Sequence, residues 1–150
     1  MTRPTREVRD AIEDLIADNV WALDTHDLDR YVATHWPEAE WIDIHADGSE
    51  IRLVGDDAIR EGTAAYFAAR DGHQHRLQSP LYVAHGADWH VWSYYWSLRR
   101  DAATGAIEVQ TAGWIRDEVE ARDGEWRIRR RTVSQWDGKL PHPLTAAGEA

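Results

Sequence analysis

The sequence predicts one α+β domain over residues 1–150, with three N-terminal helices packed on a mostly antiparallel sheet. Three observations support this prediction. A chain of 150 residues has the usual length of a single domain. Apolar side chains recur at helical spacing within residues 5–70, apart from a short hairpin, and strand-like segments separated by short turns fill most of the remainder. We therefore expect helices that cover one face of a sheet.

Helical spacing of apolar residues predicts three helices, over residues 5–23, about 27–35 and 58–70. Asn19 is the polar residue on the apolar stripe of the first helix. Asp27 is placed to cap the second helix, and Pro37 is expected to end it because proline cannot continue a helix. Asp56 and Asp57 precede the third helix, where carboxylates favour the positive end of the helix dipole.

Strand-like segments are predicted at residues 39–45, 50–54, about 74–84, 89–99, 107–120 and 126–136. The first two flank the turn sequence 46–49 and should pair as a hairpin, and the last four should form an antiparallel meander. Both alternating faces of 89–98 are rich in aromatic residues. A strand that is apolar on both sides predicts a sheet with helices on its concave face and a second subunit on its convex face.

Composition argues against several classes of function. The absence of cysteine excludes disulfides, thiolate nucleophiles and cysteine zinc sites. A net charge of -10 argues against nucleic-acid binding, and the arginine-rich segment 127–131 is expected to pair with surplus carboxylates on a solvated or dimer-facing strand. No apolar run is long enough for a membrane span and the N-terminus lacks a signal peptide, so we expect a cytoplasmic protein. Residues 139–150 are expected to form a loosely held tail.

Three segments carry a resemblance to a known family: ALDTHDLDRY (22–31), HRLQSPLYV (75–83) and AGWIRDEVEARDGEWRI (112–128). Together with the order of helices and strands, they resemble the SnoaL-like branch of the nuclear transport factor 2-like superfamily over nearly the whole chain. The resemblance implies a cone-shaped fold, in which a strongly bent sheet wraps the helices around a deep pocket. It also implies a homo-oligomer, a dimer or trimer, that forms through the sheet face.

Within this superfamily, the segment THWPEAEWIDI and the pairing of Asp24 with His75 look like hexachlorocyclohexane dehydrochlorinase and, more distantly, scytalone dehydratase. The resemblance implies that His75 abstracts a proton from carbon while Asp24 orients the imidazole and stabilises its protonated form. A neutral imidazole titrates near working pH, and a buried carboxylate on its far nitrogen fixes the tautomer. Taken singly, Asp24 is also explained as a helix cap and His75 as a hydrogen-bonded strand residue.

The resemblance supplies the remaining site residues. Asn19 stands where the dehydrochlorinase has a lysine, and Asn19 and Arg131 are expected to make the polar contacts to substrate. The expected pocket walls, chosen by strand alternation and by matching positions in the relatives, are Trp41, Tyr66, Trp92, Trp96 and Ile115. The second histidine and the tyrosines of scytalone dehydratase are missing, because residues 107–120 contain no histidine and Leu23 and Ile44 stand at the tyrosine positions. Its specific substrate chemistry is therefore not expected.

Two other sets of candidate site residues remain as alternatives. Steroid isomerases of the superfamily carry a general-base aspartate where this chain has Asp43, and SnoaL-like polyketide cyclases also use a pocket aspartate. Proton abstraction beside a carbonyl, followed by isomerisation or ring closure, is the main enzymatic alternative. His73 and His75 share one face of an extended strand and could hold a metal with Asp24, but no third ligand has a diagnostic spacing, so no metal or other cofactor is expected.

The sequence thus predicts a cofactor-independent lyase, a dehydratase or related eliminating enzyme, that acts on a bulky apolar or aromatic small molecule through Asp24 and His75. The isomerase or cyclase function is the first alternative. A non-catalytic binding or assembly module is the second, because this fold serves as a carrier and assembly unit as well as a catalyst. Geometry separates these readings, because catalysis requires the two side chains to meet at an enclosed cavity that solvent can reach.

Overall fold

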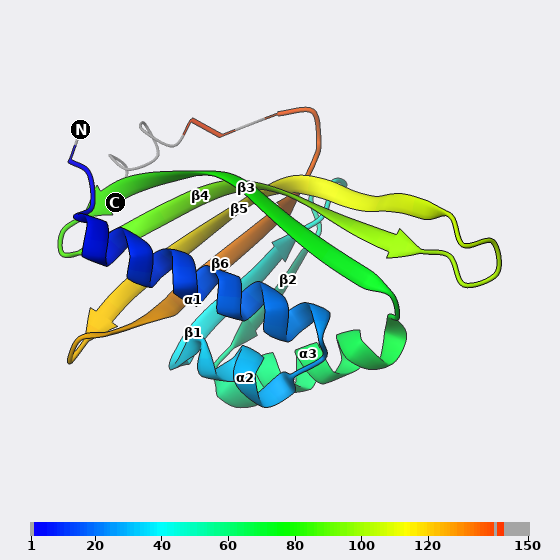
Figure 1. Cartoon of the computed structure of the whole chain (residues 1–150), viewed down its shortest axis with the longest axis horizontal. Coiled ribbons are helices and arrows are strands. Elements are labelled where there is room, and N and C mark those ends of the chain that lie inside the picture. Colours follow the sequence, from blue (N-terminus) through cyan, green and yellow to red (C-terminus); the bar gives the residue numbers. More distant parts are fainter. Residues whose placement is uncertain (1, 140, 143–150) are drawn as a thin grey trace.

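The computed structural model describes residues 2–139 and 141–142. In these residues, three helices and six strands follow one another as α1 (Arg6–Asp24), α2 (Leu28–Ala33), β1 (His35–Ile44), β2 (Glu50–Val54), α3 (Asp56–Ala69), β3 (His73–His85), β4 (Asp88–Arg100), β5 (Ile107–Arg122) and β6 (Glu125–Gln135). The helices lie on one side of a curved sheet (Figure 1). The predicted α+β class and element order are confirmed. Most of the predicted tail, residues 140 and 143–150, lies outside the described residues.

The strands form one sheet in the order β2-β1-β6-β5-β4-β3. β1 and β6 are parallel, and the other neighbouring pairs are antiparallel. The predicted hairpin and the four-strand meander are therefore both present. Because β1 joins the sheet beside β6, the N-terminal hairpin lies next to the last strand, and β2 and β3 form the two edges.

The sheet curves around the helices. Register shifts interrupt the pairing of β3 with β4, of β4 with β5 and of β5 with β6, and such bulges bend the strands that carry them. Gly113 on β5 is a second cause of curvature. A Cβ atom at Gly113 would collide with the backbone carbonyl of Ser134 on β6, so only glycine allows the two strands to approach this closely.

The two faces of the sheet differ in what covers them. We call the face that meets the helices the inner face and the opposite one the outer face. Ile12 of α1 is fully buried and packs on Trp89 and Val91 of β4, which places the odd-numbered residues of β4 on the inner face. Complete burial of an isoleucine side chain contributes about 2–3 kcal/mol to folding.

Helix α1 begins at a Thr5 cap and contributes residues to both core clusters. The Thr5 hydroxyl accepts a hydrogen bond from the Val8 backbone N–H at 3.3 Å. Ile12 belongs to the cluster over β4, β5 and β6, whereas Ala22 belongs to a second cluster with residues of α2, β1 and α3. The helix is therefore fixed at both ends, and its last residue is Asp24.

The second helix is shorter than predicted, and Pro37 does not end it. α2 stops at Ala33, the Thr34 hydroxyl donates to the Tyr31 carbonyl at 2.7 Å, and His35 already pairs with β6. Pro37 lies inside β1, where the register with β6 shifts between His35 and Glu40. A proline is tolerated there because a bulge needs no ladder hydrogen bond from its nitrogen.

No helix in the described part of the chain combines the length and the apolar character that a membrane span requires.

His35 gives the fold a predicted pH dependence. Burial, followed by the nearby charge of Arg131, lowers the pKa of His35 to about 3, and Nδ1 lies 3.1 Å from the Tyr31 carbonyl oxygen. In the unfolded chain, histidine titrates near pH 6.5. The unfolded chain therefore binds more protons between about pH 3 and 6.5, so this contribution to stability is complete above that window and is lost as the pH falls through it.

We expect the free energy of unfolding to fall more steeply in wild type than in His35→Asn between pH 6.5 and pH 4, by up to about 1.4 kcal/mol per pH unit. Asparagine keeps a donor near the position of Nδ1 but does not titrate. Urea unfolding at a series of pH values measures the slope, and His26→Asn, at an exposed position, is the matched control. Equal slopes in wild type and His35→Asn would contradict the assignment.

Candidate active site

Asp24 and His75 meet at the junction of α1 and β3. Nδ1 of His75 lies 2.6 Å from an Asp24 carboxylate oxygen, and the His75 backbone N–H donates to the two carboxylate oxygens at 2.9 and 3.1 Å. Each side chain is 15% exposed. A carboxylate can only accept, so Nδ1 carries a proton, and in the neutral imidazole Nε2 then presents a lone pair. This is the tautomer that a general base requires.

Tyr66 of α3 occupies the other side of the imidazole. Its hydroxyl lies 3.2 Å from Nε2 of His75. Burial raises the pKa of Tyr66 to about 12, against the opposing charge of Arg70 and with a smaller contribution from Asp24 in the same direction. The phenol is therefore protonated at neutral pH and donates to Nε2. Three elements, α1, β3 and α3, thus supply the chain Asp24–His75–Tyr66.

The turn after α1 holds these elements together. His26 has a φ of 58°, in the left-handed region, and reverses the chain directly after the helix. Its ring stacks on Phe67 of α3 at a centroid distance of 4.4 Å. Because Phe67 follows Tyr66 in the sequence, this contact fixes the end of α1 beside the tyrosine that meets His75.

A groove of about 260 Å³ runs between α1 and β3 and reaches His75. The Tyr82 hydroxyl donates to Glu13 at 3.1 Å near one end of the groove, and the Asp24–His75 contact joins the same two elements at the other. Between these contacts the walls are mostly apolar, with Ile16, Ala17, Val20, Trp21, Leu77 and Pro80. His75 is therefore reached by an open groove with mostly apolar walls.

Asn19 and Arg131 belong to a closed network and do not line the groove. Arg131 is 3% exposed and donates to both carboxylate oxygens of Asp117 at 2.6 and 2.9 Å, and it also donates to the Asn19 side-chain oxygen. The Asn19 amide donates to the Thr34 hydroxyl at 2.7 Å. Burial by itself lowers the pKa of Arg131, but Asp117 and Tyr31 outweigh it and leave the pKa raised. The expected role of both residues as polar contacts to substrate is corrected, because their polar atoms are already bonded inside the protein.

Trp41, Asp43 and Ile115 lie on the inner face, but in different surroundings. Trp41 packs against the core cluster beneath α2 and α3, and Ile115 is 5% exposed in the body of the sheet. Asp43 is half-buried, with one carboxylate oxygen 3.4 Å from His45 and the other without a hydrogen-bond partner in the described residues. Burial raises the pKa of Asp43 in spite of the opposing contribution of His45.

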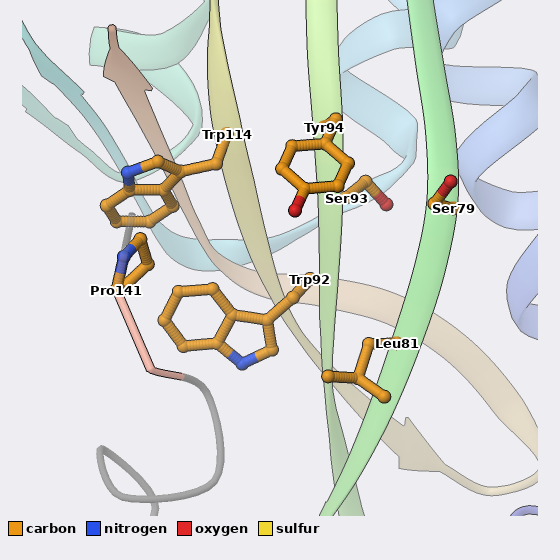
Figure 2. A pocket seen from close by; sticks show the side chains of 7 residues that line it. All are labelled: Ser79, Leu81, Trp92, Ser93, Tyr94, Trp114 and Pro141. Atoms are coloured by element: carbon orange, nitrogen blue, oxygen red, sulfur yellow. The ribbon is translucent and has the colours of Figure 1, made fainter. Parts of the chain in front are cut away.

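Trp92 and Trp96 do not share a cavity with His75. They occupy even-numbered positions of β4 and so lie on the outer face, whereas His75 pairs with Ser97 on the inner face. Trp92 instead helps to line a second cavity of about 290 Å³, together with Ser79, Leu81, Ser93, Tyr94, Trp114 and Pro141 (Figure 2). The expectation that Trp92 and Trp96 form walls of the catalytic pocket is corrected. Because β4 carries aromatic residues on both faces, its sequence does not show which face meets the helices.

The ring nitrogens of His73 contact groups other than Asp24 and His75. Its Nε2 lies 3.0 Å from the Gln110 side-chain oxygen and its Nδ1 lies 3.1 Å from the Asp71 carbonyl oxygen. In the ranges 2–139 and 141–142, no group of three or more histidine, aspartate or glutamate side chains gathers in a way that could hold a metal ion.

Sequence reasoning missed two roles. Tyr66 was expected to be a pocket wall, and its hydrogen bond to His75 was not foreseen, because helical periodicity gives the face of a residue but not the atom that its hydroxyl reaches. Asp117 was not recognised as the partner of Arg131. A signal for it existed, since Asp117 alternates with Ile115 and Val119 on a strand face that is otherwise apolar, and a carboxylate at such a position requires a buried partner.

Comparison with known proteins identifies the family. The model of the SnoaL-like domain matches residues 4–132, which is most of the chain. This chain belongs to the SnoaL-like domain family. Members of the family include polyketide cyclases and other enzymes that act on small molecules. A search of curated proteins gives no match.

Solved structures support the fold of this SnoaL-like domain. A protein with a cystatin-like fold from Nostoc punctiforme has a TM-score of 0.76 and 20% identity, over 93% of this chain and 98% of that one. An NTF2-like protein with a cystatin-like fold from Novosphingobium aromaticivorans has a TM-score of 0.75 and 20% identity, over 96% and 90%. ActVI-ORFA from Streptomyces coelicolor has a TM-score of 0.74 and 17% identity, over 85% and 97%. The expected cone-type fold is confirmed by these likenesses.

The buried network predicts that Arg131→Met loses stability. The substitution leaves Asp117 as an uncompensated buried charge, which costs about 3–5 kcal/mol of the free energy of unfolding. The double variant Arg131→Met/Asp117→Leu should recover part of that loss because no charge remains unpaired. Urea unfolding measures both, with Arg52→Met, in an exposed ion pair, as a control that changes stability little. An Arg131→Met variant of normal stability would contradict a structural role for the network.

Proposed function

We propose that this SnoaL-like domain is a cofactor-independent lyase that eliminates water or a similar group from a bulky apolar or aromatic small molecule. His75 is the general base, and Asp24 is its orienting partner. The observation that carries the proposal is the 2.6 Å contact between Nδ1 and the Asp24 carboxylate, made by two largely buried groups at a groove that solvent reaches.

The geometry of the pair supports proton abstraction from carbon. Asp24 accepts hydrogen bonds from both the backbone N–H and the ring N–H of His75. The imidazole can therefore neither flip nor exchange its tautomer without breaking the ring hydrogen bond. When Nε2 takes a proton, the positive charge that develops on the ring lies next to the carboxylate and is stabilised by it. General-base catalysis of this kind contributes about 10²–10⁴-fold to the rate.

The groove supports the substrate class. Its walls between Glu13 and His75 are mostly aliphatic or aromatic, and the indole of Trp21 is 65% exposed beside them. Apolar walls with a few polar groups are typical of sites for small apolar ligands. The volume of about 260 Å³ suits a compound of roughly one or two rings.

The roles of Asp24 and His75 can be tested with two substrates, the aldols of acetone with benzaldehyde and with naphthaldehyde. Dehydration of each aldol gives a conjugated enone, and the absorbance of the enone follows the reaction. We expect wild type to dehydrate at least one of these compounds. His75→Ala and Asp24→Asn should each lower the rate by about 10²-fold or more, because the base is lost in one case and its orientation and charge partner in the other.

His85→Ala is the matched control, because His85 is on the same strand and stacks on His90 at 4.6 Å, away from the dyad contacts. It should retain wild-type turnover. Thermal unfolding of all variants checks that the fold is intact. Wild-type activity in both His75→Ala and Asp24→Asn, or no dehydration of any compound by wild type, would rule out the proposed reaction for this substrate class.

An isomerase or cyclase function is the second candidate, and Asp43 is the observation that favours it. One carboxylate oxygen of Asp43 has no partner in the described residues, and burial raises its pKa, as a base for carbon acids requires. If Asp43 is the base, Asp43→Asn should abolish exchange of ketone α-protons with deuterium in D₂O, as followed by NMR, while His75→Ala preserves it. The reverse pattern excludes this alternative.

A further inference from the structure

We propose that Tyr66 is the general acid of the elimination, which protonates the departing oxygen of the substrate and recovers its proton from His75. The inference rests on the proposed function, since it assigns the second half of the same reaction. Tyr66 would therefore be a catalytic residue that acts beside His75, although it is not among the side chains that line the groove.

The position of the phenol carries the inference. Its oxygen lies 3.2 Å from Nε2 of His75, the atom that would take the proton from the substrate carbon. In a β-hydroxy ketone, the acidic C–H and the leaving hydroxyl stand on adjacent carbons. A substrate whose C–H points at Nε2 therefore places the leaving oxygen on the neighbouring carbon within reach of the phenol. Because base and acid lie side by side, the geometry favours loss of the two groups from the same side of the substrate.

The protonation states fit the two roles. Asp24 can only accept, and neutral His75 has no proton on Nε2, so the O–H of Tyr66 is the donor among the side chains that contact His75 in the described part of the chain. Burial keeps this O–H protonated at neutral pH by raising the pKa of Tyr66 to about 12. The guanidinium of Arg70 lies 5.0 Å from the ring centre and favours the negative charge that develops on the phenol as it donates.

The proton transfers balance without any co-reactant. Nε2 removes the proton from the α-carbon and leaves an enolate. The electron pair of the enolate then forms the carbon–carbon double bond as the bond from the β-carbon to oxygen breaks. The departing oxygen takes the phenol proton and leaves as water. The phenolate then takes the proton from Nε2 of the imidazolium through the 3.2 Å contact, which restores neutral His75 and neutral Tyr66. One proton leaves carbon and one reaches the product water.

The surroundings fix Tyr66 for this task. Arg70 donates to the Gln110 side-chain oxygen at 3.1 Å, and the same oxygen lies 3.0 Å from Nε2 of His73. These contacts tie the end of α3 to β5 and β3 on one side of the tyrosine. The stacking of His26 on Phe67 holds the neighbouring residue from the other side. The hydroxyl is therefore positioned by its surroundings, as efficient proton transfer requires.

The test uses Tyr66→Phe with the benzaldehyde–acetone aldol in D₂O, and it follows two signals: deuterium entry at the α-carbon of unreacted aldol, and formation of the enone. Proton abstraction by His75 produces the first signal, and protonation of the leaving group is needed for the second. Tyr66→Phe should lower enone formation by about 10²-fold or more through kcat, with KM little changed, and should preserve deuterium entry. His75→Ala should lose both signals.

Leaving-group rescue makes the test specific. The acetate ester of the same aldol loses acetate, which needs no proton to depart, so Tyr66→Phe should eliminate it at close to the wild-type rate. Tyr95→Phe is the matched control, because Tyr95 is a buried inner-face tyrosine whose hydroxyl contacts Thr111 at 3.1 Å, and it should dehydrate the aldol normally.

Each outcome decides the question. Normal enone formation by Tyr66→Phe, equal loss of both signals in a folded Tyr66→Phe protein, or an acetate ester that is not rescued would overturn the role of Tyr66 and leave His75 as the base. Retention of both signals in His75→Ala would instead overturn the proposed function itself. Thermal unfolding distinguishes a folded variant from one that has lost its structure.

Discussion

The buried guanidinium of Arg131 ties together the elements on which the rest of this structure depends. It connects β6 to Asp117 on β5 and to Asn19 on α1, and Asn19 continues the network to Thr34 at the end of α2. Withdrawing a charge from water carries a large cost that only complete pairing offsets, so the arrangement tolerates little displacement of any partner. An apolar contact would allow α1 to slide along the sheet. The directional bonds of the network instead fix its axial position.

That position determines where the proposed catalytic groups lie. Asp24 follows Asn19 by five residues on the same helix, so fixing Asn19 over β6 places Asp24 about 7–8 Å further along the helix axis. There it meets the backbone and the ring of His75 on the edge strand β3. The proposed acid comes from a third element, α3. Asp24 and His75 are 51 residues apart in the sequence, so the packing of α1, α3 and β3 brings the three groups together.

The sequence predicted the parts of this arrangement that depend on periodicity and short turns, and it missed those that depend on long-range contacts. Helices, hairpin and meander follow from spacing, and the Asp24–His75 contact follows from the family resemblance. How deeply a polar side chain is buried does not follow from spacing or from the resemblance. Arg131 was expected in a pocket because the family resemblance placed it there, whereas the structure pairs it with Asp117 on the neighbouring strand. Trp92 and Trp96 were assigned to the inner face because period-two alternation defines two faces without showing which one meets the helices.

The bulge in β3 illustrates how one irregularity shapes both sides of the sheet. Pairing of β3 with β4 is interrupted between Gln78 and Leu81, so Ser93 of β4 has no partner across this gap. Ser93 borders the groove that reaches His75 and also the outer cavity beside Trp92. A bulge of this kind bends the strand that carries it and increases its local twist. The groove and the Asp24–His75 contact are therefore both formed between α1 and this bent edge strand.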